Sequence, residues 1–361
     1  MRMISAEDLD DMALGAAVLG TGGGGNPYIG RLMAQAALRK YGPVKLIDAS
    51  ELNDDDMVVP AAMMGAPTVM VEKIPAGHEV VTAFKKLEAY MGKPFSAVMS
   101  GEIGGLNSVV PFTVAAALGL PMVDADGMGR AFPELQMSIP AMIGVTAYPM
   151  AIADEKGNSA IISTINNHWT ETLARTLTID MGCSAMVALY AMTGRQVKDG
   201  AVLGTITQTE QIGRALREAT ANHIDPVEAV RAVTNGAIIW TGKISDIQRR
   251  TETGFARGDA YIAGLGPNEG ETLQISFQNE FLIGRTSDRV LITTPDLITM
   301  LDAETGHPIT TEELRYGFRV AVLAIPCDPR WRSEEGLRLA GPRYFGYDVD
   351  YLPFDQRIAT N

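Results

Sequence analysis

The sequence predicts an α/β N-terminal domain with a mainly parallel sheet, followed by a β-rich (α+β) C-terminal domain. Two observations predict the first domain: strands and helices alternate up to about residue 165, and a strand–loop–helix–strand unit spans residues 95–126. A third predicts the second domain, because β-rich runs separated by Gly, Pro, Asn and Asp follow residue 201. We place the boundary near residue 165, which gives domains 1–165 and 166–361. A chain of 361 residues that is 46% hydrophobic suits this organisation.

The composition limits the classes of partner. The net charge is −13, from 30 Lys and Arg against 43 Asp and Glu, and no basic block stands out. Nucleic acid and anionic membrane surfaces are therefore poor partners. The two cysteines, Cys183 and Cys327, form neither a disulfide framework nor a metal-like pair, and the N-terminus lacks a signal-peptide core. No run of 18 apolar residues is present, so we expect a cytoplasmic protein without a membrane span.

The chain begins with two predicted helices that flank a glycine run. Ser5 and Asp8 form a capping pair, and the apolar residues after them have helical spacing. After the glycine run, Asn26 is a suitable N-cap and Pro27 a suitable first residue of the second helix, which Gly42 ends. The next predicted elements are strands at 44–48 and 57–64 and a helix at 77–91.

The glycine run is the first candidate binding element. Glycines let backbone N–H groups approach a ligand, and the following helix presents its positive end to an anion. A dinucleotide-binding loop follows a strand, whereas helical spacing precedes this run, so no dinucleotide cofactor is expected. The alternative is a plain corner between two helices. The predicted substrate-binding residues here are Gly22, Gly23, Gly24, Gly25 and Asn26.

Three acidic residues follow the two strands of the central unit. Glu102 follows the strand at 95–99. A helix at 108–118 then connects this strand to the next, which starts at residue 121 and ends in Asp124 and Asp126. Parallel strands end on one edge of the sheet, where open α/β sheets bind ligands. We therefore predict that these three acids are catalytic. The alternative is that the two aspartates merely cap a turn with the glycines that follow.

A second polar cluster, residues 164–171, opens a predicted long helix at 169–192. Strands at 139–145, 150–153 and 160–163 come before it. The helix is apolar on nearly all faces and is expected to be buried. His168, which precedes it, is a candidate catalytic residue, with capping or packing as the alternative. Asp180 and Cys183 are secondary candidates, because a buried Asp needs a partner, although a buried Cys is usually a small hydrophobe.

The remainder of the chain is mainly β. After a strand at 202–207 and two helices ending at 221 and 234, the predicted strands are 238–248, 257–265, 272–282, 290–293 and 318–325, an arrangement typical of a sandwich or barrel. The polar residues Gln278-Asn279-Glu280 interrupt one apolar run. Glu280 is therefore a secondary site candidate, which we expect to face a cleft. The equally weighted alternative is that these residues are the exposed positions of an alternating strand.

Four motifs together resemble a bacterial family. They are LGTGGGGNP, SGEIGGLNS, MVDADGMGRAFPELQM and NNHWTETLARTLTIDMGCSA. The family was formerly a domain of unknown function whose genes often lie near hydantoinase and oxoprolinase genes, and it is now grouped with S-methyl thiohydantoin desulfurases. The resemblance covers nearly the whole chain. It implies an α/β N-terminal domain, a β-rich C-terminal domain, a homo-oligomer and a possible association with a hydantoinase or oxoprolinase.

The residues suggest how such a protein performs hydrolytic desulfuration of a thiohydantoin-type ring. The reaction needs a base for water, stabilisation of the ring anion and a proton donor for the leaving sulfur. We predict that Glu102, Asp124 and Asp126 act as base or bind a cation and that His168 supplies a ligand or a proton. The predicted cofactor is a divalent metal (Zn, Mn or Mg) held by Asp124, Asp126 and His168. Further predicted substrate-binding residues are Asn107 and Arg130.

Two other functions fit the same residues. One is a dinucleotide-dependent oxidoreductase that uses the glycine run. The other is a non-catalytic accessory subunit of a hydantoinase or oxoprolinase, which predicts a stable complex on co-purification and no turnover alone.

Overall fold

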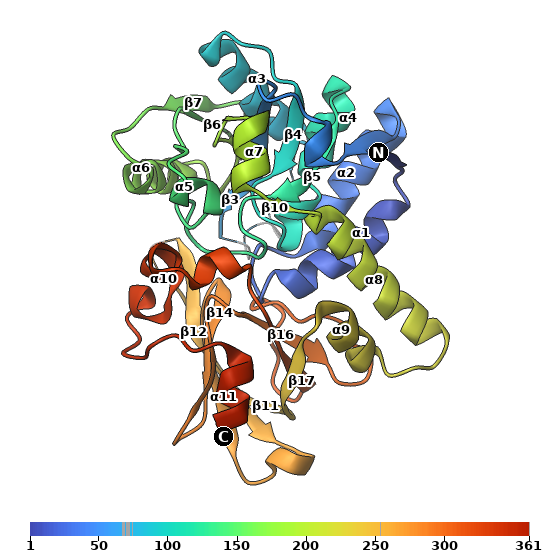
Figure 1. The fold of residues 1–361 in the computed structure, drawn as a ribbon, viewed down its shortest axis with the longest axis vertical. Coiled ribbons are helices and arrows are strands. Elements are labelled where there is room, and N and C mark those ends of the chain that lie inside the picture. Colours follow the sequence, from blue (N-terminus) through green and yellow to red (C-terminus); the bar gives the residue numbers. More distant parts are fainter. Residues whose placement is uncertain (67–68, 70–72, 74, 253, 361) are drawn as a thin grey trace.

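A computed structural model describes residues 1–361 except 67–68, 70–72, 74, 253 and 361. The chain forms two domains, one above the other in Figure 1. The upper one contains a mixed sheet with a parallel core and covering helices, and the lower one an antiparallel sheet. The predicted fold class is confirmed.

The first sheet has the strand order β1-β2-β5-β4-β3-β8-β6-β7, with β10 paired to β5 and β9 to β3. Strands β2, β5, β4 and β3 run parallel, as predicted for the central unit. The bounds are β1 Arg2–Ile4, β2 Val44–Ile47, β3 Met57–Gly65, β4 Ala97–Ser100, β5 Met122–Asp126, β6 Met150–Ala153, β7 Ser159–Ile162, β8 Ser184–Ala188, β9 Met192–Thr193 and β10 Val202–Leu203. Strands β8, β9 and β10, which follow residue 165, belong to the same sheet as the strands before it. The domain boundary predicted near residue 165 stays a prediction.

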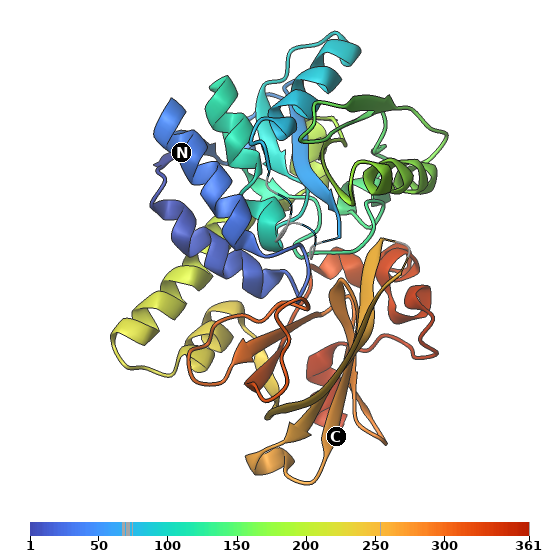
Figure 2. The ribbon, with the colours of Figure 1, turned by 180° about the vertical axis from the view of Figure 1, so that it is seen from behind.

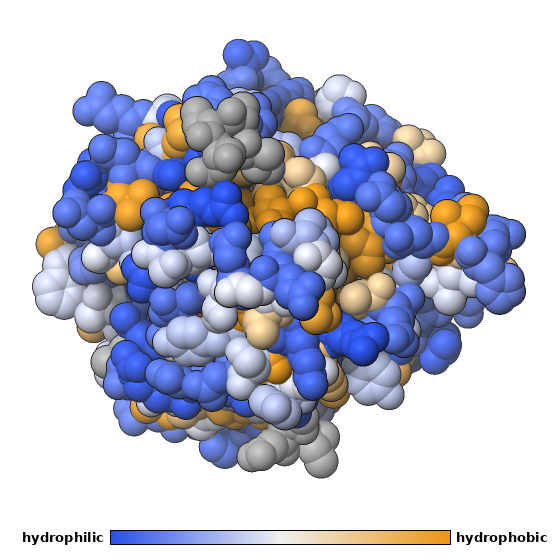
Figure 3. Space-filling model, turned by 90° about the horizontal axis from the view of Figure 1, so that it is seen from below, coloured by the Kyte–Doolittle hydropathy of each residue, from blue (hydrophilic) through white to orange (hydrophobic). Residues whose placement is uncertain are grey.

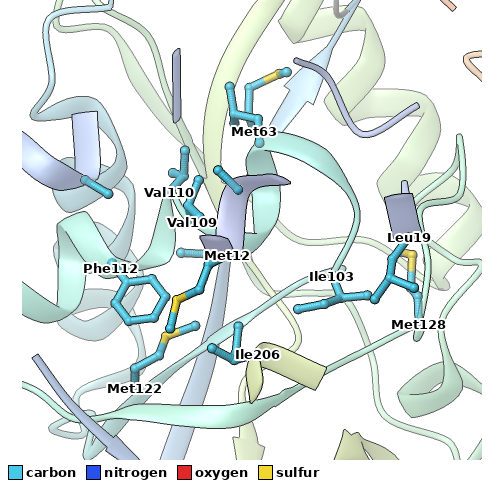
Figure 4. Packing of buried hydrophobic residues seen from close by; sticks show 14 of the residues in the cluster. Met12, Leu19, Met63, Ile103, Val109, Val110, Phe112, Met122, Met128 and Ile206 are labelled. Atoms are coloured by element: carbon cyan, nitrogen blue, oxygen red, sulfur yellow. The ribbon is translucent and has the colours of Figure 1, made fainter. Parts of the chain in front are cut away.

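Helices cover both faces of the first sheet, which is why its strands are apolar throughout. Along β3, Val59 and Ala61 pack against one helical layer, and Val58 and Ala62 against the other. Figure 4 shows residues of α1, α4, β5 and α8 packed together in the first layer. The helices are α1 Asp8–Leu19, α2 Pro27–Tyr41, η1 Ala49–Glu51, α3 Glu79–Met91, η3 Gly105–Ser108, α4 Pro111–Leu118, α5 Ile139–Met142, α6 Asn167–Asp180, α7 Gly194–Gly200, α8 Thr205–Ala221 and α9 Pro226–Thr234.

Two elements of this domain differ from the prediction. The predicted strand at 139–145 is wrong, because residues 139–142 form the short helix α5. Ser138 caps its first turn, and Pro140 suits that turn. The long buried helix at 169–192 is also wrong: α6 ends at Asp180, Gly182 and Cys183 turn at φ 90° and 62°, and β8 follows. Side chains on one side of α6 are exposed. The sequence pattern did not show this, because the small apolar residues of β8 were counted as part of the helix.

The second sheet is antiparallel, with the order β15-β14-β13-β12-β11-β17-β16, and Figure 2 shows it curling below the first domain. Its strands are β11 Ala237–Glu252, β12 Phe255–Gly264, β13 Thr272–Gln278, β14 Glu280–Arg285, β15 Val290–Thr293, β16 Leu297–Asp302 and β17 Arg319–Ile325. Strand β16 was missed by the prediction. The other elements are η4 Gly266–Asn268, η5 Pro329–Arg332, α10 Glu334–Ala340, η6 Pro342–Phe345 and α11 Phe354–Thr360.

The predicted strand at 272–282 divides into β13 and β14 at Asn279, whose φ is 58°. This tight turn directs Asn279 and Glu280 to the first domain, where both line a cavity. Seen from the end of the second domain, the surface is largely hydrophilic with hydrophobic residues gathered toward its middle (Figure 3). Among the described residues, no helix combines the length and apolarity that crossing a membrane requires.

Candidate active site between the two domains

A cavity of about 100 Å³ lies where the two domains meet. The first domain supplies the ends of β3 and β4, part of β8 and one side of α6, and the second supplies the turn between β13 and β14. The polar side chains that line it are Glu102, Asn107, Ser138, Glu171, Arg175, Tyr190, Asn279 and Glu280. The cavity is therefore at the carboxyl edge of the parallel strands, where the sequence predicted a site.

Glu102 follows β4 and is only 7% exposed. Its Oε1 accepts a hydrogen bond from Asn107 Nδ2 at 2.6 Å, and its Oε2 accepts one from the Phe132 N–H at 3.2 Å. Burial raises the pKa of Glu102 to about 7, against the lowering effect of these two hydrogen bonds. Glu102 can therefore exchange a proton near neutral pH.

Asn107 orients Glu102. Its Oδ1 accepts from the Met63 N–H at 2.6 Å, and its Nδ2 donates to the Met63 carbonyl at 3.1 Å as well as to Glu102. Both amide hydrogens are thus used inside the protein. Asn107 lines the cavity as predicted for a binding residue, but these contacts fit a positioning role.

Glu280 enters the cavity from the second domain and is 2% exposed. Its Oε1 accepts from the Gly24 N–H at 3.2 Å, while its Oε2 has no hydrogen-bond partner among the described residues. Burial raises the pKa of Glu280 well above its ordinary value, and the nearby Glu102 charge raises it further. Ionisation of Glu102 therefore favours the protonated form of Glu280. Of the two alternatives for Glu280, the cleft-facing one is confirmed.

The glycine run connects α1 to α2, as predicted. The carboxylate that contacts it belongs to Glu280 of this same protein. Gly24 alone of the run lines the cavity, and its N–H is donated to Glu280. A Cβ on Gly23 would lie 2.0 Å from Glu280 Oε1, so a glycine is needed there for Glu280 to approach. Gly22 packs against the Phe281 ring, and Asn26 caps α2 and donates to Glu313. Substrate binding by this run stays a prediction.

Arg130 is fully buried behind the cavity and joins the two domains. Its guanidinium donates to the carbonyls of Pro295 and Asp296 and to the Thr21 hydroxyl. Burial lowers the pKa of Arg130 to about 10, and its positive charge lowers the pKa of Glu280. It is not among the residues that line the cavity, so its placement fits electrostatic tuning of the carboxyl pair.

Asp126 and Asp124 have separate surroundings. Asp126 is fully buried, and its Oδ2 accepts from the Met128 and Gly129 N–H groups at 2.8 Å, the turn-capping alternative left open by the sequence. Burial raises the pKa of Asp126 to about 7, and its charge raises the pKa of Glu102, so these two acids lie near each other as predicted. Asp126 is nevertheless not among the residues that line the cavity, and its catalytic role stays a prediction. The carboxylate of Asp124 instead accepts from the N–H and hydroxyl of Thr207 in the first turn of α8. The predicted convergence of Asp124 on the cavity is wrong.

Replacing Asp124 by Ala is expected to affect stability and not the chemistry of the cavity. The change removes the acceptor for the first turn of α8, which costs about 1 kcal/mol of unfolding free energy. Urea denaturation with fluorescence detection measures this loss. A matched turnover assay should give a kcat within twofold of the unaltered protein, and a hundredfold fall would show that Asp124 acts in the reaction.

The three remaining candidates lie outside the cavity. His168 is exposed at the start of α6, Asp180 is exposed at its end, and Cys183 is half-buried in the turn that follows. None of the three lines the cavity, to which α6 presents Glu171 and Arg175 instead, and their predicted roles stay predictions.

The predicted metal ligands are not assembled. Asp124 is bonded to Thr207, Asp126 caps a turn and His168 is exposed. In the described part of the chain, no group of three or more His, Cys, Asp or Glu side chains is arranged to hold a metal ion. The donor set therefore does not fit the predicted metal.

The sequence also missed several cavity residues. Glu171 and Arg175 are four apart on α6, a spacing that usually marks an exposed ion pair, yet Glu171 is buried and the side chain of Arg175 is only 11% exposed. Tyr190 has φ 51° and donates its hydroxyl to the Leu135 carbonyl, and Asn279 is held by the Ala256 backbone. No local sequence signal reveals these positions, since domain packing creates them.

This chain is similar to two family models and to a solved structure. Models of the S-Me-THD-like N-terminal and C-terminal domains match residues 7–164 and 165–354. An X-ray crystal structure of a protein from Chromobacterium violaceum, from a structural genomics consortium, is 25% identical and has a TM-score of 0.82. That similarity covers 98% of this chain and 100% of the other. No curated protein matches this sequence.

Proposed function

We propose, from the premise that this chain belongs to the S-Me-THD-like family, that it hydrolyses the carbon–sulfur bond of an S-methyl thiohydantoin-type ring. One observation carries the proposal: Glu102 and Glu280, from different domains, line the same cavity with raised pKa values. Such a pair supplies a base and an acid at one pH. The burial of both carboxyl groups also strengthens their electrostatic interactions with a bound ring.

The carboxyl pair balances the protons of the reaction. Ionised Glu102 accepts a proton from water as its oxygen attacks the ring carbon that bears sulfur. The electron pair of the C=N bond moves to the ring nitrogen, which takes from Glu102 the proton that Glu102 received from water. The C–S bond then breaks, the sulfur leaves as methanethiol with the proton of Glu280, and the hydroxyl proton restores Glu280. The ring is left with a carbonyl, and both carboxyl groups recover their initial states.

The direct test is release of methanethiol from an S-methyl thiohydantoin by the purified protein. A thiol reagent detects the product, and mass spectrometry detects the hydantoin ring formed with oxygen from labelled water. We expect turnover that follows protein concentration. Absence of turnover, together with a stable complex between this protein and a hydantoinase or oxoprolinase, would instead favour the accessory-subunit function.

The rate of this reaction is expected to have a bell-shaped pH dependence. The acidic limb reports ionisation of Glu102, whose pKa is about 7, so the rate rises as pH increases from 5 to 7. The alkaline limb reports loss of the Glu280 proton, whose pKa is raised further by the Glu102 charge. In Glu102→Gln that charge is absent, so the alkaline limb of any residual activity moves to lower pH. An initial-rate series from pH 5 to 10 measures both limbs, and a flat profile would contradict the assignment.

A further inference from the structure

The cavity contains a basic side chain that the proposed reaction does not use. Arg175 of α6 is the one cationic residue among the described residues that line the cavity. Its side chain is 11% exposed, and its partner Glu171, one helical turn earlier, is 7% exposed. Because both lie on the side of α6 that faces the sheet, they form part of the cavity wall and not of the outer surface.

The contacts of Arg175 leave one nitrogen available. Nε donates to Glu171 Oε1 at 2.8 Å, and Nη2 donates to the Pro133 carbonyl at 3.1 Å and lies 2.7 Å from Glu171 Oε1. The guanidinium carbon lies 4.4 Å from the centre of the Phe255 ring of β12. No described residue accepts a hydrogen bond from Nη1. The guanidinium is therefore held in place by both domains while one NH₂ group keeps its donors.

The charges around Arg175 disfavour an anionic ligand. Glu171 neutralises the guanidinium, and its other oxygen, Oε2, accepts from the Leu135 N–H, so the pair is fixed. Glu102 and Glu280 line the same cavity, and any negative charge shared by them repels a ligand carboxylate. A neutral carbonyl oxygen accepts from Nη1 without that repulsion.

The remaining walls favour an apolar substituent. Thioether and aliphatic side chains from β3, β4, β6 and β8 line the cavity, and methionine adapts its shape to irregular apolar groups. They are Met63 and Met64 of β3, Met99 of β4, Met150 of β6 and Val187 of β8.

We infer that Arg175 binds a neutral carbonyl oxygen of the ring, and that the cavity selects uncharged rings with an apolar substituent over rings that carry a carboxylate. This inference rests on the proposed function, because it assumes that a thiohydantoin-type ring occupies the cavity. Glu171 acts through Arg175 as a positioning residue.

Binding of two unreactive hydantoins tests the inference without turnover. Both rings have oxygen where the substrate has sulfur; one bears a 5-isobutyl group and the other a 5-carboxymethyl group. Calorimetry on the full chain should show tighter binding of the isobutyl ring by about tenfold or more. In Arg175→Met, affinity for the isobutyl ring should fall about tenfold, the loss expected for one hydrogen bond from a charged donor.

Two further variants control for folding and for general charge effects. Arg175→Met leaves Glu171 buried without its partner, so the double variant Glu171→Gln/Arg175→Met removes that charge and should show the same loss of affinity. Arg195→Met breaks an exposed ion pair of the same spacing with Asp199 and should bind like the unaltered protein.

The outcomes separate the inference from the proposed function. Unchanged affinity in the folded double variant, or tighter binding of the carboxymethyl ring by the unaltered protein, overturns the inference and leaves the proposed function intact. Failure of the unaltered protein to bind either ring overturns both.

Discussion

Replacing Glu102 by Gln is expected to lower kcat for desulfuration by about 100-fold or more, the usual contribution of a general base. Glutamine keeps the shape and can still accept hydrogen bonds from Asn107 and Phe132 through its oxygen, but it cannot take a proton from water. KM should change little, because Glu102 acts on the attacking water. Removing a buried group with a raised pKa is also expected to preserve or increase stability, so a loss of rate reports chemistry.

His168→Ala is the matched control for that experiment. His168 is exposed on α6, and we expect its replacement to leave kcat within twofold. Initial rates over a range of substrate concentrations, with thermal unfolding of each variant, provide the comparison. Equal losses in Glu102→Gln and His168→Ala would show that the reaction takes place outside the cavity described here.

Replacing Glu280 by Gln is expected to lower kcat by a similar factor and to remove the alkaline limb of the pH profile. The amide cannot act as the acid, whereas its oxygen can still accept from the Gly24 N–H. A substrate with a better leaving group than methanethiolate, such as an S-aryl thiohydantoin, needs less protonation of sulfur. Glu280→Gln should therefore recover part of its rate on that substrate, and Glu102→Gln should recover less.

This difference in recovery distinguishes the acid from the base. Pre-steady-state measurement of thiol release gives the chemical step directly. Equal recovery in both variants would mean that the two carboxyl groups exchange roles or act only as a pair, since strongly coupled groups titrate together.

Features set by local or topological rules were predictable from the sequence. Asn26 and Pro27 begin α2 as capping rules require, and parallel strands bring Glu102 and Asp126 to the same edge. By contrast, Asp124 finds its partner in Thr207, 83 residues later, a contact that strand position does not reveal.

The second carboxyl group required information that a single sequence does not carry. Whether Glu280 faces solvent or a cleft depends on the turn at Asn279 and on how the second domain packs against the glycine run. His168 was a candidate partly because histidine is rare in this sequence, but the rarity of a residue type does not show where the residue lies in the fold. The polarity of α6 was misread for a related reason, since the small apolar residues after Gly182 belong to β8 and extended an apparent helix.

The hydrogen bond from the Gly24 N–H to Glu280 makes that amide a spectroscopic probe. A donor facing a carboxylate resonates at lower field than one facing a neutral acid, so the magnetic resonance signal of this one glycine should follow the proton on Glu280 through a titration. The protonation state of the acid could then be followed in solution without substrate and without altering a single residue.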